Sequence, residues 1–176
     1  MRVRVRDDDV LIAGIYYRSV FARFCRIHEI IVNNDGLHVP AIMVNPIMDH
    51  PECIAFIRHE TIRGNMRPEL HCLDHIDYGT LSETELDANL RYCVEWFEDN
   101  LWIKPSIFYT PWGGDSPLIR SVAAKYGLTL GECTRLIRPF HIIKNPEMEC
   151  KELQIHWWDK KDRRTLEQAL KILGRK

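Results

Sequence analysis

Short apolar segments rich in β-branched residues alternate with longer segments of helical periodicity, and this alternation constrains the fold of the chain more than any other feature. The segments with strand character are residues 2–6, 38–46, 69–71, 105–109, 134–137 and 153–156. Segments with apolar residues three and four positions apart separate or follow them, at residues 19–33, 52–63, 82–100, 118–126 and 165–173. Because a helix between two strands favours parallel pairing, the pattern predicts an α/β fold with a closed or partly closed parallel sheet.

The clearest helix signal lies in residues 82–100. Ser82 and Glu85, three positions apart, form the capping-box pattern that begins a helix. The apolar residues that follow recur at helical spacing: Leu86, Leu90, Cys93, Val94 and Phe97. We therefore expect an amphipathic helix packed against the sheet.

The composition is that of an ordinary globular protein. The chain has 176 residues, 45% hydrophobic and 28% charged, so we expect a single domain over residues 1–176. The formal net charge is −1 and the basic residues are scattered, which argues against a nucleic-acid partner. No apolar run approaches the roughly 18 residues of a membrane-spanning helix, and the N-terminus lacks signal-peptide features. We expect a cytoplasmic protein without membrane contact, of unknown oligomeric state.

Two common zinc motifs are missing from the sequence. The six cysteines are widely spread and form no Cys-x-x-Cys pair, which argues against a structural zinc knot. His59-Glu60 begins the metalloprotease pattern His-Glu-x-x-His, but the fifth residue is Arg63. A metal site, if present, has to use another set of residues.

Ionisable residues collect at the predicted ends of three strands. Aspartates 7–9 follow the first strand, His71 and His75 follow the third, and His156 ends a late strand. Because the carboxyl ends of parallel strands share one edge of a sheet, these side chains could face one cleft. Two imidazoles and a carboxylate, completed by water, make an open catalytic site of the zinc type, in which the metal acidifies its water and polarises a carbonyl.

Four segments, in matching order and spacing, resemble the motifs of the polysaccharide deacetylases, also called the NodB-homology proteins or carbohydrate esterase family four. Residues 6–10 (RDDDV) resemble the first motif, a strand ending in two aspartates. Residues 70–75 (LHCLDH) resemble the second, a histidine pair four positions apart. Residues 108–113 (FYTPWG) are similar to the Arg-x-Pro-aromatic-Gly groove wall, and residues 153–156 (LQIH) to the final strand ending in histidine.

The resemblance implies a distorted (β/α) barrel, abbreviated in this short chain, that removes acetyl groups from N-acetylated amino sugars or polysaccharide. It implies one divalent metal, most often Zn²⁺, held by Asp9, His71 and His75. It further implies that Asp8 is the general base and His156 the general acid. The residues expected to bind the carbohydrate are Tyr109, Pro111, Trp112, Gly113 and Trp157, with the tryptophans able to stack on a sugar ring.

The chain departs from the family pattern at two places. Tyr109 stands where the third motif carries an arginine that orients the base, so Arg6 or Arg138 would have to substitute, or the base is tuned differently. The fourth motif, an aspartate and tryptophan segment that supports the acid, has no clear match in residues 134–139, and Asp159 is a possible local replacement.

Three functional alternatives follow from these patterns. The first is an active metal-dependent deacetylase, which retention of both Asp8 and His156 favours. The second is a catalytically weak relative that binds carbohydrate or metal, which the tyrosine at position 109 favours. The third is another carbon-nitrogen amide hydrolase on the same scaffold, which only a substrate assay separates from the first.

Overall fold

The computed structural model describes residues 2–10, 17–132, 136–156 and 159–175, and only the backbone at residues 9 and 17. Its centre is a parallel sheet of six strands in the order β5-β4-β3-β2-β1-β6. The strands are β1 (Arg4–Val10), β2 (Leu37–Met43), β3 (Glu69–Cys72), β4 (Ile107–Phe108), β5 (Thr129–Leu130) and β6 (Glu152–His156). The alternating sequence pattern thus predicted the parallel α/β architecture correctly.

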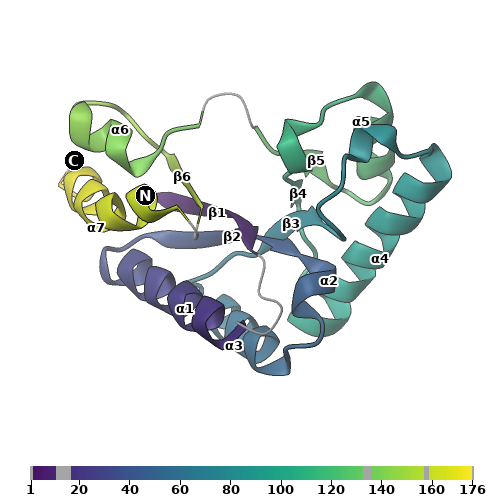
Figure 1. The fold of residues 1–176 in the computed structure, drawn as a ribbon, viewed down its shortest axis with the longest axis horizontal. Coiled ribbons are helices and arrows are strands. Elements are labelled where there is room, and N and C mark those ends of the chain that lie inside the picture. The colour runs from purple at the N-terminus through teal and green to yellow at the C-terminus, as the bar shows by residue number, and fades with distance from the viewer. Residues whose placement is uncertain (1, 11–16, 133–135, 157–158, 176) are drawn as a thin grey trace.

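Helices cover the outer side of the curled sheet (Figure 1). They are α1 (Tyr17–Asn33), α2 (Val44–Ile47), α3 (Pro51–Ile62), α4 (Glu83–Leu101), α5 (Pro117–Lys125), α6 (Pro139–Lys144) and α7 (Lys160–Leu173). Two short 3₁₀ helices, η1 (Tyr78–Thr80) and η2 (Pro111–Gly113), follow β3 and β4. The largest group of buried apolar side chains extends over β2, β3, α3, α4 and α5, and a second lies between β1, β6, α1 and α7.

The last strand lies beside the first. β6 pairs in parallel with β1, with Val5 opposite Leu153 and Asp8 opposite His156. β5 pairs with β4 at the other edge of the described sheet, so the described strands form a curled half-barrel. This pairing places residue 8 next to residue 156, although 148 positions separate them (156 − 8).

The capped helix is confirmed. α4 begins after Ser82, whose side chain accepts a hydrogen bond from the Glu85 amide, while the Glu85 carboxylate accepts one from the Ser82 amide. It ends at Trp102, which has a left-handed backbone conformation (φ 58°). Every helix that the structure describes is too short or too polar to cross a membrane.

Several element boundaries differ from the sequence prediction. The strand expected over residues 38–46 ends at Met43, and residues 44–47 form α2. The two-residue strand β5 and the helix α6 were not predicted. The strand expected over residues 134–137 falls largely outside the described residues, and residues 136 and 137 are not in a strand.

Candidate active site

A cavity of about 430 Å³ lies where the carboxyl ends of β1, β3 and β6 meet the segment after β4. Its lining includes four ionisable residues singled out from the sequence, Asp8, His71, His75 and His156. The rest of its lining consists of Arg6, Thr110, Trp112, Gly113, Leu136 and Gln154. The structure therefore brings together strand-end residues that the sequence separates by up to 148 positions (156 − 8).

Alternation along β1 decides which aspartate enters this cavity. Arg6 and Asp8, two positions apart, share the face that lines the cavity. Asp7 is fully buried, with Oδ2 3.7 Å from Nε2 of His38 on β2. The Asp9 side chain, expected to be a metal ligand, lies outside the described residues. Asp8 is therefore the aspartate of this run that is seen in the cavity.

Arg6 and Gln154 hold the Asp8 carboxylate. Arg6 Nε lies 3.0 Å from Oδ1 of Asp8, and Arg6 Nη2 donates to Oδ2 at 3.0 Å. Gln154, opposite Arg6 in the β1–β6 ladder, donates from Nε2 to the same Oδ2. A guanidinium that contacts both oxygens fixes the plane of a carboxylate as well as its position. Arg6 thus fills the role expected of either Arg6 or Arg138.

The Arg6 side chain is itself fixed by burial and by two further contacts. Its side chain is 1% exposed, Nη1 donates to the Glu132 carbonyl oxygen at 2.8 Å, and the guanidinium carbon lies 4.3 Å from the centroid of the Tyr109 ring. Burial raises the pKa of Tyr109 to about 12, so its phenol stays neutral beneath the cation. A Cβ at Gly131 would lie 2.1 Å from the Tyr109 ring, so glycine is required for this close packing. Tyr109 therefore contacts the arginine that holds Asp8 and carries no charge itself.

The histidine pair forms another wall. His71 is buried, and its Nδ1 lies 2.5 Å from the Tyr109 carbonyl oxygen, which can only accept a hydrogen bond. Nδ1 therefore carries the proton and Nε2 carries the lone pair, the arrangement usual in a metal-binding histidine. The ring centroids of His71 and His75 are 5.3 Å apart. The two imidazoles are therefore suited to bind one divalent metal.

The described side chains do not include all three of the expected metal ligands. Those side chains form no group of three histidine, cysteine, aspartate or glutamate residues able to hold a metal ion. Asp9, the expected third ligand, is excluded from that search because only its backbone is described. Two of the three expected ligands, His71 and His75, are described, and both fit zinc, since imidazole is a preferred ligand of this borderline-soft ion.

His156 lies at the end of β6 in a polar setting. Its Nδ1 lies 2.6 Å from Arg138 Nη1, which also donates to the Asp162 carboxylate. The His156 backbone N–H donates to Asp162 Oδ2 at 3.1 Å. Asp159, the possible local replacement for the fourth motif, caps α7 by accepting from the Lys161 amide at 2.7 Å, and its backbone N–H donates to the His156 carbonyl oxygen at 2.8 Å. Asp162, one turn further along, is the buried partner, and burial raises the pKa of its carboxyl group.

The predicted carbohydrate-binding residues differ in their exposure. Trp112 is 71% exposed and meets the edge of His75, with ring centroids 4.5 Å apart. Gly113 also lines the cavity and has a positive φ of 69°, which suits glycine. Tyr109 and Pro111 are buried behind this surface. Trp157 lies outside the described residues.

Four residues of the site were not recognised as such from the sequence. Gln154 contacts Asp8, Thr110 and Leu136 line the cavity, and Asp162 contacts both Arg138 and the His156 backbone. Gln154 carried a usable signal, because it lies two positions before His156 on the same strand and therefore shares its face. No sequence feature distinguished Asp162, since it is one of several charged residues in the first turns of the amphipathic helix α7.

Comparison in sequence alone finds nothing: no model of a known protein family and no curated protein matches the chain. Solved structures match it over nearly its whole length. A family 4 carbohydrate esterase from Streptomyces lividans, solved with acetate, gives a TM-score of 0.76 at 15% identity, covering 98% of this chain and 88% of that one. A peptidoglycan deacetylase from Bacillus subtilis gives 0.72 at 12% identity, covering 99% and 82%.

A third similar structure is a CE4 family pseudoenzyme from Bacillus anthracis, with a TM-score of 0.76 at 14% identity. The match covers 99% of this chain and 60% of that one, so the chain spans less than two thirds of the pseudoenzyme. At these identities the likeness concerns the fold. The chain therefore has the curled α/β half-barrel fold of the family 4 carbohydrate esterases and polysaccharide deacetylases.

Proposed function

We propose that this chain is a metal-dependent deacetylase that hydrolyses the acetamide of an N-acetylated amino sugar in an oligosaccharide or polysaccharide. The observation that carries the proposal is the cavity itself. Asp8 and His156 lie opposite each other in the β1–β6 ladder, and the His71–His75 pair lines the same cavity. A base and an acid beside a pair of metal-type ligands is the arrangement that amide hydrolysis needs.

Asp9, His71 and His75 would hold the metal, with Zn²⁺ the best fit to two imidazoles and a carboxylate. Bound there, the ion would lower the pKa of a water molecule and polarise the acetyl carbonyl. His71 is prepared for this role, because the Tyr109 carbonyl fixes its tautomer and the orientation of its ring.

Asp8 takes a proton from the attacking water while the water oxygen bonds to the acetyl carbon. Arg6 and Gln154 keep the carboxylate in place, so that its position does not depend on the substrate. A base held in hydrogen-bond reach of its proton is worth roughly 100- to 10,000-fold in rate. The buried Arg6 side chain performs the positioning that the arginine of the third motif performs in the family pattern.

His156 gives a proton to the sugar nitrogen as the carbon-nitrogen bond breaks, which releases acetate and a free amine. An amine is a poor leaving group until it is protonated, so the step requires an acid on the side of the nitrogen. Asp162 accepts from the His156 backbone N–H at 3.1 Å and so keeps the end of β6 in place. The same carboxylate pairs with Arg138 and offsets the positive charge of the guanidinium beside the imidazole, which must itself be protonated to act as the acid. The exposed face of Trp112 at the rim is suited to stack on the sugar ring.

A carbohydrate-binding protein without turnover is the second candidate. A pseudoenzyme shares the fold, and this chain has a tyrosine in place of the motif-three arginine. The contact between Arg6 and Asp8 favours the active candidate, because it restores a charged partner for the base. A third candidate, another carbon-nitrogen amide hydrolase, uses the same groups and differs only in substrate.

The deciding experiment measures metal content and acetate release together. The purified full chain should contain about one divalent ion, and it should release acetate from N-acetylglucosamine oligomers in a chelator-sensitive manner. His71→Ala and His75→Ala should each abolish stoichiometric binding, whereas His59→Ala, an exposed histidine on α3, should leave metal content unchanged. Full occupancy in both variants would overturn the ligand assignment, and binding without acetate release would favour the non-catalytic candidate.

A further inference from the structure

The two histidines expected to bind the metal are held in different ways. His71 is part of strand β3, it is buried, and its ring donates to the Tyr109 carbonyl oxygen. His75 lies beyond Cys72, the last residue of that strand, in a segment of bends. The position of His75 therefore depends on how residues 73 and 74 are fixed.

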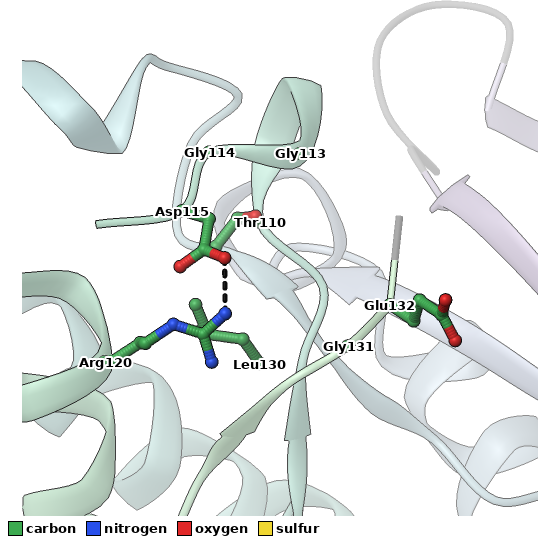
Figure 2. Close-up of a pocket in the computed structure, with 8 residues that line it drawn as sticks. All are labelled: Thr110, Gly113, Gly114, Asp115, Arg120, Leu130, Gly131 and Glu132. Carbon is green, nitrogen blue, oxygen red and sulfur yellow. Dashed lines mark hydrogen bonds and ion pairs between the residues drawn. The ribbon is translucent and has the colours of Figure 1, made fainter. Parts of the chain in front are cut away.

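Packing from the cavity side gives His75 little support. Its ring meets the edge of Trp112, with ring centroids 4.5 Å apart, but the Trp112 side chain is itself 71% exposed. Trp112 belongs to the short turn between Thr110 and Gly114, which Figure 2 shows. An exposed side chain on such a turn is a weak support for a metal ligand. The support of His75 has to come from the backbone that carries it.

The Tyr78 hydroxyl holds that backbone at residue 73. Tyr78 is 1% exposed, and its hydroxyl accepts a hydrogen bond from the Leu73 N–H at 2.9 Å. The Tyr78 ring packs edge-on against Phe108 of β4, with ring centroids 5.3 Å apart. Burial raises the pKa of the Tyr78 phenol, so the hydroxyl stays neutral. A side chain that is fixed in the core thus holds the loop from inside.

Asn45 holds the same loop from the neighbouring strand. β2 and β3 pair as far as Met43 and Cys72, and just beyond them the Asn45 N–H donates to the Leu73 carbonyl oxygen at 3.1 Å. Asn45 is in the first turn of α2, where backbone N–H groups have no partner within the helix, so this N–H is available to the loop. The Asn45 side chain also donates from Nδ2 to Asp74 Oδ2 at 2.7 Å.

These contacts meet at the two residues that precede His75. Leu73 is held at both its N–H and its carbonyl oxygen, and Asp74 is held by its side chain. The Asp74 carbonyl oxygen accepts from the Ile76 N–H at 2.8 Å, which closes a tight turn with His75 at its centre. Because this turn is closed, fixing residues 73 and 74 also fixes the direction in which the His75 side chain leaves the backbone.

We propose that Tyr78 and Asn45 are positioning residues that hold His75 beside His71 in the metal-free chain, with the two rings 5.3 Å apart. Both act through the backbone of residues 73 and 74. A ligand that is already in place loses less conformational freedom when the metal binds, so its preorganisation increases the affinity. This inference rests on the proposed function, since the ion concerned is the one that His71 and His75 bind there.

Zinc titrations of the metal-free full chain measure the effect without requiring turnover. Tyr78→Phe removes the hydroxyl and keeps the ring in the core, and Asn45→Ala removes the side-chain contact with Asp74. Each substitution should weaken Zn²⁺ binding by roughly 10- to 100-fold, the usual effect of losing a group that orients a metal ligand. The double variant should bind more weakly than either single variant.

Two matched controls remove the same chemical groups elsewhere. Tyr126→Phe deletes a phenol hydroxyl that donates to the Asp87 carbonyl oxygen at 3.3 Å. Asn89→Ala deletes an amide that donates to the Glu85 carbonyl oxygen at 2.8 Å. Neither Tyr126 nor Asn89 lines the candidate active-site cavity, so both controls should keep the wild-type affinity for zinc.

Hydrogen exchange of the metal-free chain supplies a readout that a general loss of stability would not move. The Leu73 amide should exchange slowly in the wild type and rapidly in Tyr78→Phe, while the amides of α4 stay protected in both. Unchanged zinc affinity in Tyr78→Phe and Asn45→Ala would overturn the proposal, as would rapid exchange at Leu73 in the metal-free wild type. Zinc binding that depends on both residues, without acetate release, would instead refute the deacetylase function and leave this positioning role standing.

Discussion

Arg6 and Asp8, two positions apart on β1, face the same cavity, and the buried guanidinium of Arg6 lies 3.0 Å from each carboxylate oxygen of Asp8. The contact is formed within a single strand, so no loop movement is needed to bring the two groups together. Arg6 is in turn fixed by the Glu132 carbonyl and the Tyr109 ring. The base of the proposed reaction is therefore positioned before any substrate binds.

Arg6→Gln should lower kcat/KM for acetamide hydrolysis by roughly 100-fold, because misplacing a reacting group by about 1 Å has effects of that size. Metal content should not change. Arg4→Gln is the matched control, since Arg4 is on the same strand but pairs with Glu152 at 3.1 Å. Wild-type activity in a folded Arg6→Gln variant would show that Asp8 does not depend on Arg6.

Asp8→Asn and Asp9→Asn should separate the base from the metal ligand. Loss of the Asp8 carboxylate removes a proton acceptor, so hydrolysis should fall by roughly 100-fold or more while the metal remains bound. Asp9→Asn should release the metal. Elemental analysis and acetate release, measured on the same samples, check both variants. If Asp8→Asn loses the ion and Asp9→Asn keeps it, the two roles must be exchanged.

His156→Ala should affect amide and ester substrates unequally. Acetamide cleavage needs a proton on the leaving nitrogen, so its rate should drop by roughly 100-fold or more. An activated aryl acetate has a leaving group that departs unaided and should be spared. The ratio of the two kcat/KM values is the measurement. Equal losses on both substrates, at unchanged metal content, would indicate that His156 stabilises the oxyanion or supports packing.

The stability of the fold should decrease as the solution becomes acidic, because of two buried histidines. His28 Nδ1 lies 3.2 Å from His38 Nδ1, and His28 Nε2 lies 3.0 Å from the Glu60 carboxylate. Burial lowers the pKa of both histidines below the ordinary 6.5, only partly offset at His28 by Glu60. Below pH 6.5 the unfolded chain therefore binds more protons than the folded chain.

The free energy of unfolding should thus fall as the pH drops below about 6.5, by up to about 1.4 kcal/mol per pH unit for each histidine. Urea unfolding at pH 7.5, 6.5 and 5.5 measures this slope. His38→Gln should flatten the slope, because it removes one of the two buried imidazoles. A slope that is identical in wild type and His38→Gln would assign the acid sensitivity to other groups.

The fold was largely predictable because it depends on local patterns. Periodicity alone indicates the helices α1, α3, α4, α5 and α7, and the Ser82–Glu85 pair marks the start of α4. The strands β2, β3, β4 and β6 follow from short apolar runs, whereas β1, expected over residues 2–6, spans Arg4–Val10 and includes the three aspartates that were expected to follow it. β5 was missed because two residues, Thr129–Leu130, are too few to show any period, and they become a strand only by pairing with β4.

The residues of the site were also predictable up to a point. Asp8, His71, His75 and His156 could be named from their places at the ends of strands, and the structure brings all four to one cavity. Which partner each would have could not be read from the chain. The sequence left open whether Arg6, Arg138 or neither would contact Asp8, and it offered Asp159 only as a possible local replacement for the fourth motif.

Tertiary structure decided both questions. Pairing of β1 with β6 brings Gln154 to the Asp8 carboxylate that Arg6 of the same strand contacts, while α6 and α7 bring Arg138 and Asp162 to His156. The sequence by itself determined the order of the longer helices and of the strands other than β5, and the alternation of side chains along each strand, because backbone geometry repeats over two to four residues. Arg6 and the Glu132 carbonyl are separated by 126 positions, so their contact exists only when the whole sheet has folded.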